Sequence, residues 1–251
     1  SKLAKFIHPA DVENFQKNGF IFRENFLAAE EFSQLKQELL TTPLETRETL
    51  QGDTVTRRMA LDGKTLKHMP VTRQFLHSAK WRNLLNYVAS FKVQPISYLQ
   101  VIFSHVRKAK ADPQTNLHSD TFHPSAKAWL FLEDVAADEG PFVYVPGSHL
   151  LNPARLNWEQ QKSEAITAKT DVMTRRGSFR VSESEILELG YVKPQAFAVK
   201  ANTLVIADTY GFHARAKSLK PSVRIELWAY ARRNPFMLWL GGDPLSLPFL
   251  K

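Results

Sequence analysis

The sequence contains no cysteine among its 251 residues. Disulfide bonds and thiolate chemistry are therefore excluded, and a bound metal would have to be held by nitrogen and oxygen ligands. No apolar run approaches the roughly 18 to 20 residues that cross a bilayer. The opening SKLAKFIHPADVENF lacks the apolar stretch of a secretory signal, although a leader removed before Ser1 stays open. These absences predict a cytoplasmic protein without a transmembrane segment.

Acidic residues are scarce relative to basic ones. Lys and Arg number 33 against 25 Asp and Glu, which gives a net charge of +8 and a pI near 9.6. A solvated basic surface would explain this charge, and so would an anionic partner such as a carboxylated or phosphorylated small molecule. The charges are scattered and no nucleic-acid motif stands out, so we expect no nucleic-acid partner. Transient contact with an anionic membrane surface stays open.

The length fits one large domain or two small ones, and we expect a single domain over residues 1–251. Residues 1–95 predict mainly helical support for it. Pro9 suits the first position of a helix, and Gly19 suits its end. Apolar residues recur at helical spacing in two further segments, EEFSQLKQELL and WRNLLNYVASF.

Residues 96–251 predict the β core of the domain. Short β-rich segments follow one another there: SYLQVIFSHV, KAWLFLEDV, PFVYV, AFAVKA, TLVIAD and SVRIELWAYA. Helices followed by such strands favour an all-β sandwich or roll with flanking helices. Residues 151–194 interrupt the strands with helical and loop-like sequence, where Ser182 and Glu185 predict a capping box. An insertion of this size lies over a site or is plain decoration, and we expect the former.

The stretch HSDTFH holds the first candidate ligands. His118 and Asp120 are two residues apart, so on an extended segment both side chains point to the same side and can meet one ion. His-x-Asp is a weak motif alone, and a third ligand must come from elsewhere. His213, just beyond TLVIAD, is the candidate. Two histidines and one carboxylate leave coordination positions open, as in the non-haem Fe(II) oxygenases, which can then bind a 2-oxo acid and O2.

A candidate anion-binding group follows eleven residues after His213, where Arg224 lies in the strand SVRIELWAYA. An arginine is well suited to pair with the distal carboxylate of 2-oxoglutarate. Alternation predicts two faces for this strand. Val223, Ile225, Leu227 and Ala229 form one, and Arg224, Glu226, Trp228 and Tyr230 form the other. A polar face with an arginine beside aromatic residues fits a cavity lining, although an amphipathic strand facing water stays open.

Together these features resemble the phytanoyl-CoA dioxygenase (PhyH) family of Fe(II)/2-oxoglutarate oxygenases. The resemblance lies in His-x-Asp, the Trp129 strand, the Glu-Gly-Pro and Pro-Gly-Ser-His motifs within 139–149, the distal His213 and Arg224. The segment NFQKNGFIFRENFLAAEEFSQLKQEL is similar to the family's opening, so the likeness covers nearly the whole chain. It implies a mainly β fold with flanking helices, the double-stranded β-helix or cupin-like jelly-roll.

The resemblance also implies a set of cofactors. Fe(II) would be held by His118, Asp120 and His213. The cosubstrate 2-oxoglutarate would pair with Arg224 near Trp129, O2 would be consumed, and ascorbate would serve as an optional reductant. Because a small residue replaces the aspartate in related halogenases, Asp120 favours hydroxylation, with desaturation and ring closure left open.

Other contacts are less defined by the resemblance. Tyr98 and Gln100 share a strand face and are candidates for a further cosubstrate contact. The family often has a small hydroxyl residue where this chain has Arg215, which changes part of that contact. His149 belongs to a turn at the cavity mouth and is not a ligand, whereas His123 is expected on the substrate side.

Arginines in two variable stretches suggest the substrate class. They are Arg57, Arg58, Arg175, Arg176 and Arg180, and together with Arg215 they predict a small anionic substrate. An acyl thioester, a natural-product intermediate and an acidic sugar of a surface glycolipid all qualify. Two alternatives remain: a cupin-like isomerase or hydrolase using Zn or Mn without 2-oxoglutarate, and a catalytically silent jelly-roll that binds an anionic partner.

Overall fold

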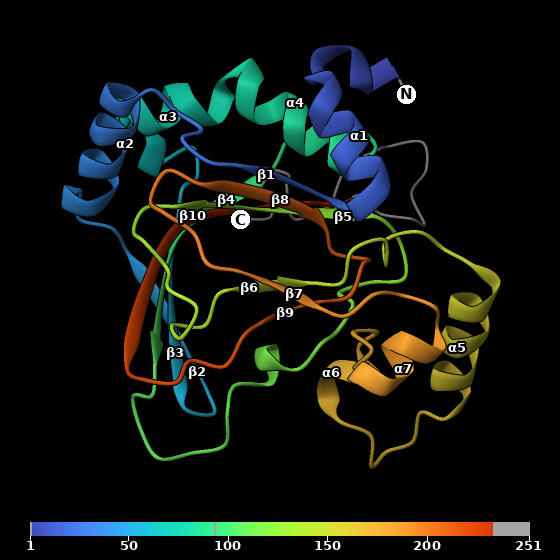
Figure 1. Ribbon diagram of the computed structural model, residues 1–251. Helices are drawn as coiled ribbons and strands as arrows, with labels where there is room; N and C mark the ends of the chain where they lie inside the picture. The colour runs from blue at the N-terminus through green and yellow to red at the C-terminus, as the bar shows by residue number, and fades with distance from the viewer. Residues whose placement is uncertain (1, 93, 233–251) are drawn as a thin grey trace.

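The computed structural model describes residues 2–92 and 94–232. Within them, two antiparallel sheets lie one over the other (Figure 1). The larger sheet has the strand order β1-β8-β5-β10-β4-β3-β2, and the smaller has the order β7-β6-β9. The strands are β1 (Phe20–Arg23), β2 (Thr46–Gln51), β3 (Thr54–Ala60), β4 (Ile96–Ser104), β5 (Ser125–Phe131), β6 (Phe142–Tyr144), β7 (Gln195–Phe197), β8 (Leu204–Asp208), β9 (His213–Arg215) and β10 (Ser222–Arg232). The predicted mainly β architecture is confirmed.

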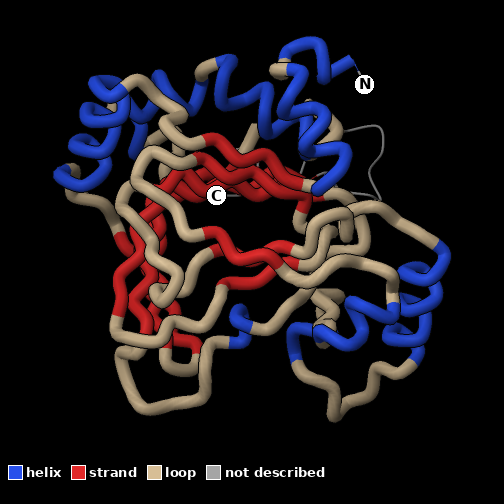
Figure 2. Tube along the Cα trace, in the orientation of Figure 1, coloured by secondary structure: helices blue, strands red, loops and turns tan. Residues whose placement is uncertain are grey.

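Helices from the first third of the chain cover the outer face of the large sheet (Figure 2). They are η1 (Lys2–Phe6), α1 (Pro9–Asn18), α2 (Ala29–Thr41), η2 (Thr65–His68), α3 (Pro70–His77) and α4 (Ala79–Val88). Leu35 and Trp81 on these helices share one buried cluster with Leu130 and Leu227 on the sheet. Burial of this apolar face fixes the sheet against the helices, so its opposite face is left to build a site.

Local sequence signals explain where the first helix begins and ends. Pro9 opens α1, and Gly19 ends it with φ of 87°, a left-handed conformation that glycine adopts without strain. The region 1–95 is not helical throughout, because it also contributes β1, β2 and β3. The β2–β3 hairpin turns at Gly52, with φ of 59°. Its strands are rich in threonine and arginine, so they lack the apolar runs that mark the later strands.

The insertion 151–194 forms a helical layer beside the small sheet. Its helices are α5 (Pro153–Glu164), α6 (Val172–Arg175) and α7 (Glu183–Glu188), while the short η3 (Pro113–Thr115) lies before β5. Trp158 and Ile186 of the insertion pack against Val145 and Phe212 of the core. The capping box predicted at Ser182 is present. Among the described helices, none is long and apolar enough to cross a membrane.

Candidate active site

Backbone pairing brings two distant histidines side by side. His118 precedes β5 and His213 opens β9, and each donates its backbone N–H to the other's carbonyl, at 3.0 and 2.9 Å. Their ring centroids are 4.5 Å apart. Asp120 is held nearby by a backbone hydrogen bond to the carbonyl of Thr209. One potential ligand atom from each of His118, Asp120 and His213 lies within 4.8 Å of the others, so these three residues could hold a metal ion.

The two imidazoles present their free nitrogens toward this centre. Nδ1 of His118 is 2.7 Å from the carbonyl of Asn116, and Nδ1 of His213 is 3.0 Å from the carbonyl of Gly211. Donation from Nδ1 to a carbonyl leaves Nε2 as a lone-pair donor for a metal. Burial lowers the pKa of both histidines, so both rings are neutral. Nε2 of His118 is buried without a hydrogen-bond partner, which fits a metal ligand and is costly otherwise.

The carboxylate between the histidines is ionised. Burial acts to raise the pKa of Asp120, but the ammonium of Lys127 and the two histidines outweigh it and hold that pKa well below its usual value. Nζ of Lys127 lies 2.6 Å from Oδ2 of Asp120. The same oxygen is 3.6 Å from Nε2 of His213, while Oδ1 is 3.8 Å from Nε2 of His118. Asp120 is therefore a charged oxygen donor on the histidine centre.

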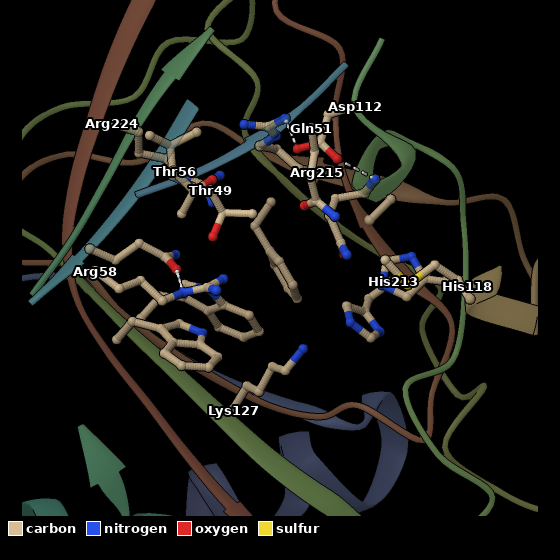
Figure 3. A pocket seen from close by; sticks show the side chains of 18 residues that line it. Thr49, Gln51, Thr56, Arg58, Asp112, His118, Lys127, His213, Arg215 and Arg224 are labelled. Atoms are coloured by element: carbon tan, nitrogen blue, oxygen red, sulfur yellow. Dashed lines mark hydrogen bonds and ion pairs between the residues drawn. The ribbon is translucent and has the colours of Figure 1, made fainter. Parts of the chain in front are cut away.

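A cavity of about 340 Å³ extends from the histidines between the two sheets (Figure 3). His118 and His213 stand at one end of it and Arg224 at the other, and Trp129 and Phe142 line its side. The rings of Trp129 and Phe142 have centroids 4.7 Å apart. An elongated molecule can therefore contact the histidine centre and Arg224 at the same time.

The far end of the cavity is a network of charged groups. Arg224 is 7% exposed, donates to the carbonyl of Gly140 at 3.0 Å, and lies 3.0 Å from the buried Glu226. Gln100 joins this network by donating to Glu226 and accepting from Nε of Arg58, both at 2.6 Å. Arginine and glutamate alternate with apolar residues along β10, so the predicted cavity-facing side of this strand is the observed one.

Arg215 also lines the cavity, where it is anchored by the loop that carries η3. Its Nη2 lies 2.8 Å from Oδ2 of Asp112 and donates to the hydroxyl of Thr54 at 3.2 Å. The arginine that departs from the family pattern is thus ion-paired. Three guanidinium groups (those of Arg58, Arg215 and Arg224) therefore line the cavity, and the carboxylates of Asp112 and Glu226 pair with two of them.

Several residues expected near the substrate do not line this cavity. Arg57 is exposed on the opposite side of β3, pairs with Glu48 and lies over Phe103, because neighbouring residues of a strand face opposite ways. His123 points its Nδ1 to the carbonyl of Pro124 instead. Arg175 and Arg176 are exposed at the end of α6, whereas Met173 of the same helix reaches the cavity.

Two more residues lie at the border of the site. Tyr98 belongs to a neighbouring pocket, lined also by Arg58, and its ring contacts Trp228 at a centroid distance of 5.6 Å. Arg180 pairs by its backbone with His118, and its Nη1 donates to Ser178. His149 packs against Phe15 and is not among the residues that line the cavity.

Sequence reasoning missed three charged residues of the site. Lys127 and Trp129 are two residues apart on β5, so strand alternation could have placed the lysine in the cavity. Glu226 was assigned to the correct face without a role as the partner of Arg224. Asp112 lies in a loop, and no periodic signal connects it with Arg215.

Comparisons with known proteins place this geometry in a family. The model of the phytanoyl-CoA dioxygenase (PhyH) family matches residues 15–182. The chain belongs to the PhyH family. No curated protein sequence matches the chain.

Solved structures with a similar fold include three enzymes. The epimerase SnoN, in complex with Fe3+, alpha ketoglutarate and nogalamycin RO, is 19% identical with a TM-score of 0.59, covering 94% of this chain and 92% of that one. HygX from Streptomyces hygroscopicus, with nickel and 2-oxoglutarate bound, is 13% identical with a TM-score of 0.56, covering 89% and 86%. The carbocyclase SnoK from nogalamycin biosynthesis is 17% identical with a TM-score of 0.53, covering 90% and 84%. At these identities the likeness supports the jelly-roll fold.

Proposed function

We propose that this PhyH-family protein is an Fe(II)/2-oxoglutarate-dependent oxygenase that hydroxylates a small anionic molecule in the cytoplasm. The observation that carries the proposal is the cavity with two chemically different ends. One end presents the histidine centre, and the other presents the buried Arg224. A bidentate 2-oxo acid whose second carboxylate is several atoms away matches both ends.

The ligand set fits iron. His118 and His213 would supply two neutral nitrogens and Asp120 one charged oxygen, which leaves the remaining positions for cosubstrate and O2. Fe(II) with 2-oxoglutarate and O2 supplies oxidative decarboxylation and the oxidising power for a C–H bond. The carbonyls of Asn116 and Gly211 fix the imidazole tautomers, so the chain orients these ligands before a metal arrives.

The charges of the cavity fit a dicarboxylate. Apart from the histidine centre, three guanidinium groups against the carboxylates of Asp112 and Glu226 leave one positive charge in excess. A divalent metal and Asp120 together also leave one positive charge in excess, before the ammonium of Lys127 beside Asp120 is counted. Each of these charges would thus neutralise one carboxylate of 2-oxoglutarate. The side chains of Trp129 and Phe142 would exclude water from the carbon atoms between the two carboxylates.

Hydroxylation is the proposed outcome, although similar folds carry other reactions. SnoN is described as an epimerase and SnoK as a carbocyclase, and both are alpha ketoglutarate-dependent. Asp120 occupies the position that a halogenase would need for chloride, so it favours hydroxyl over halogen transfer. The choice among hydroxylation, desaturation and ring closure depends on where the substrate carbon is held.

An anaerobic titration of the protein with Fe(II) and then 2-oxoglutarate tests the proposal. A visible metal-to-ligand charge-transfer band should appear only after both additions. Asp120→Ala should abolish it and weaken metal binding by more than the roughly 100-fold that loss of an outer-shell partner can cost. Lys200→Met is the matched surface control and should leave the band unchanged. Metal binding without a band would favour a cupin-like metalloenzyme, and no metal binding would favour a silent binding protein.

A further inference from the structure

A second cavity of about 240 Å³ adjoins the first on the Asp120 side of the histidine centre. The two cavities share Lys127 and Trp228 in their linings, so these side chains form the partition between them. Asp120 and Thr209 line the second cavity, and so do Tyr230 and Arg232 of β10. We call this space the side cavity. The proposed function assigns no role to it.

The walls of the side cavity suit a flat or ring-shaped molecule. Trp228 and Tyr230 project from the same face of β10, with ring centroids 5.4 Å apart at an interplanar angle of 44°. Strand β5 runs beside them and places Lys127 opposite Tyr230 in the pairing register. Aromatic side chains give large contact area with little loss of conformational freedom, and they pack well against rings. The hydroxyl groups of Ser125 and Thr209 bond to each other at 2.9 Å and make the inner wall polar.

Lys127 is the one cation that both cavities share among the described residues, and its partner is the carboxylate a metal would take. Its Nζ is 2.6 Å from Asp120. A metal bound by His118, Asp120 and His213 shares the negative charge of Asp120 and repels the neighbouring ammonium. By contrast, Arg215 and Arg224 are each paired with a carboxylate that does not belong to the histidine centre, so a metal there leaves these pairs intact. Metal loading therefore frees the charge of Lys127 for another anion.

We propose that the side cavity is the substrate subsite and that it binds a small ring-bearing molecule with one oxyanion group, a carboxylate or a phosphate. Lys127 pairs with this oxyanion once metal occupies the histidine centre, and the ring lies against Trp228 and Tyr230. The inference rests on the proposed function and deepens it by naming the substrate chemistry. In this inference the anion-binding group of the substrate site is Lys127, beside the histidine centre, and not the exposed Arg175 and Arg176.

Calorimetry on the anaerobic protein loaded with Fe(II) and 2-oxoglutarate tests this subsite with three probes: benzoate, phenyl phosphate and benzamide. Saturating 2-oxoglutarate keeps the anions off the metal and Arg224. We expect at least one anion to bind more tightly than the neutral benzamide. Lys127→Met should weaken that anion by about tenfold or more, as expected for loss of a charge-assisted hydrogen bond, and leave benzamide unchanged. The tighter anion identifies carboxylate or phosphate as the natural group.

Matched variants separate charge from packing. Lys200→Met removes an exposed lysine that also pairs with an aspartate, Asp134, and should change nothing. Trp228→Leu should weaken the binding of the anions and of benzamide alike, because ring contact does not depend on charge. If Lys127→Met is unstable, Lys127→Gln provides the same comparison.

The charge-transfer band distinguishes the two levels of failure. If the band forms but no probe anion shows saturable binding, the subsite inference is wrong and the proposed function stands. The same holds if the anions bind equally to the wild type and to Lys127→Met. If Lys127→Met weakens 2-oxoglutarate and leaves the anionic probes unchanged, Lys127 belongs to the cosubstrate and the inference is also wrong. If the band never forms in the wild type, the proposed function itself fails.

Discussion

The cavity wall and the helical insertion each carry a pair of adjacent arginines, and the two pairs have different environments. On β3, Arg58 faces the cavity and bonds to Gln100, while Arg57 faces solvent. In the insertion, Arg175 and Arg176 are both exposed. A paired strand assigns neighbouring side chains to opposite faces, so β3 places one arginine of its pair in the site and the other in solvent. The end of a short helix does not direct neighbouring side chains to opposite faces.

The comparison teaches that the buried arginines of this protein have oxygen partners, whether they line the cavity or only hold the fold together. Burying a guanidinium group is costly unless a carboxylate or carbonyl oxygen receives it. Arg215 and Arg224 in the wall have such partners, and so does Arg155 in the insertion. Variants of the buried wall should therefore affect both ligand binding and stability, whereas variants of the insertion should affect stability alone or nothing.

Arg224→Met should have the largest effect on the wall. It removes the charge-assisted contact that we propose for the cosubstrate, and we expect the affinity for 2-oxoglutarate to fall by about 10- to 100-fold. It also leaves Glu226, which is fully buried, without its cation, so the free energy of unfolding should fall by about 3–5 kcal/mol. Titration of the charge-transfer band and urea unfolding measure the two effects.

The double variant Arg224→Met with Glu226→Gln separates the effect on cosubstrate affinity from the effect on stability. Removing the orphaned carboxylate should restore most of the lost stability, because no buried charge is left without a partner. The affinity for 2-oxoglutarate should stay low. Recovery of cosubstrate affinity in the double variant would show that Arg224 acts only to neutralise Glu226.

Arg155→Leu should have the next largest effect, confined to stability. The Arg155 side chain is fully buried, contacts Glu159 at 2.7 Å, donates to the carbonyl of Tyr210 at 3.1 Å and lies over the ring of Phe212. Its loss removes the cation beside Glu159 and the donor to the carbonyl of Tyr210, so we expect a cost of about 3 kcal/mol in unfolding free energy. The affinity for 2-oxoglutarate should change by less than about twofold, since none of the described residues that Arg155 contacts lines the cavity.

Arg175→Leu is the matched control in the same segment, because Arg175 is exposed and its loss should be nearly neutral. A parallel fall of stability and cosubstrate affinity in Arg155→Leu would contradict the independence of the insertion from the wall.

Local patterns predicted much of the fold and the centre of the site. The termini of α1, the capping box at Ser182 and the two faces of β10 follow from short-range rules that tertiary contacts here reinforce. The grouping of His118, Asp120 and His213 needed the family resemblance as well, because the two histidines are 95 positions apart. The β2–β3 hairpin was missed since its strands carry few apolar residues.

Ion partners could not be predicted, for a physical reason. Which carboxylate receives a buried arginine depends on distances between elements that no local period encodes. Asp112 reaches Arg215 from a loop 103 positions away, and the pairing of Lys127 with Asp120 depends on the path of the chain just before β5. The sequence therefore indicated the ligands and Arg224 while leaving the charge balance of the cavity undetermined.

Replacing Arg175 and Arg176 together with alanine should have the smallest effect of all. Both side chains are exposed, so stability should stay within about 0.5 kcal/mol of the wild type. Binding of the anionic probe to the loaded protein should also stay within about twofold, because Lys127 and not this pair neighbours the histidine centre. Calorimetry beside Lys127→Met makes the comparison direct. A loss of anion affinity in the double alanine variant would instead place the anion in the groove that Arg175 lines with Phe122 and Leu156, on the far side of the Asp120 loop.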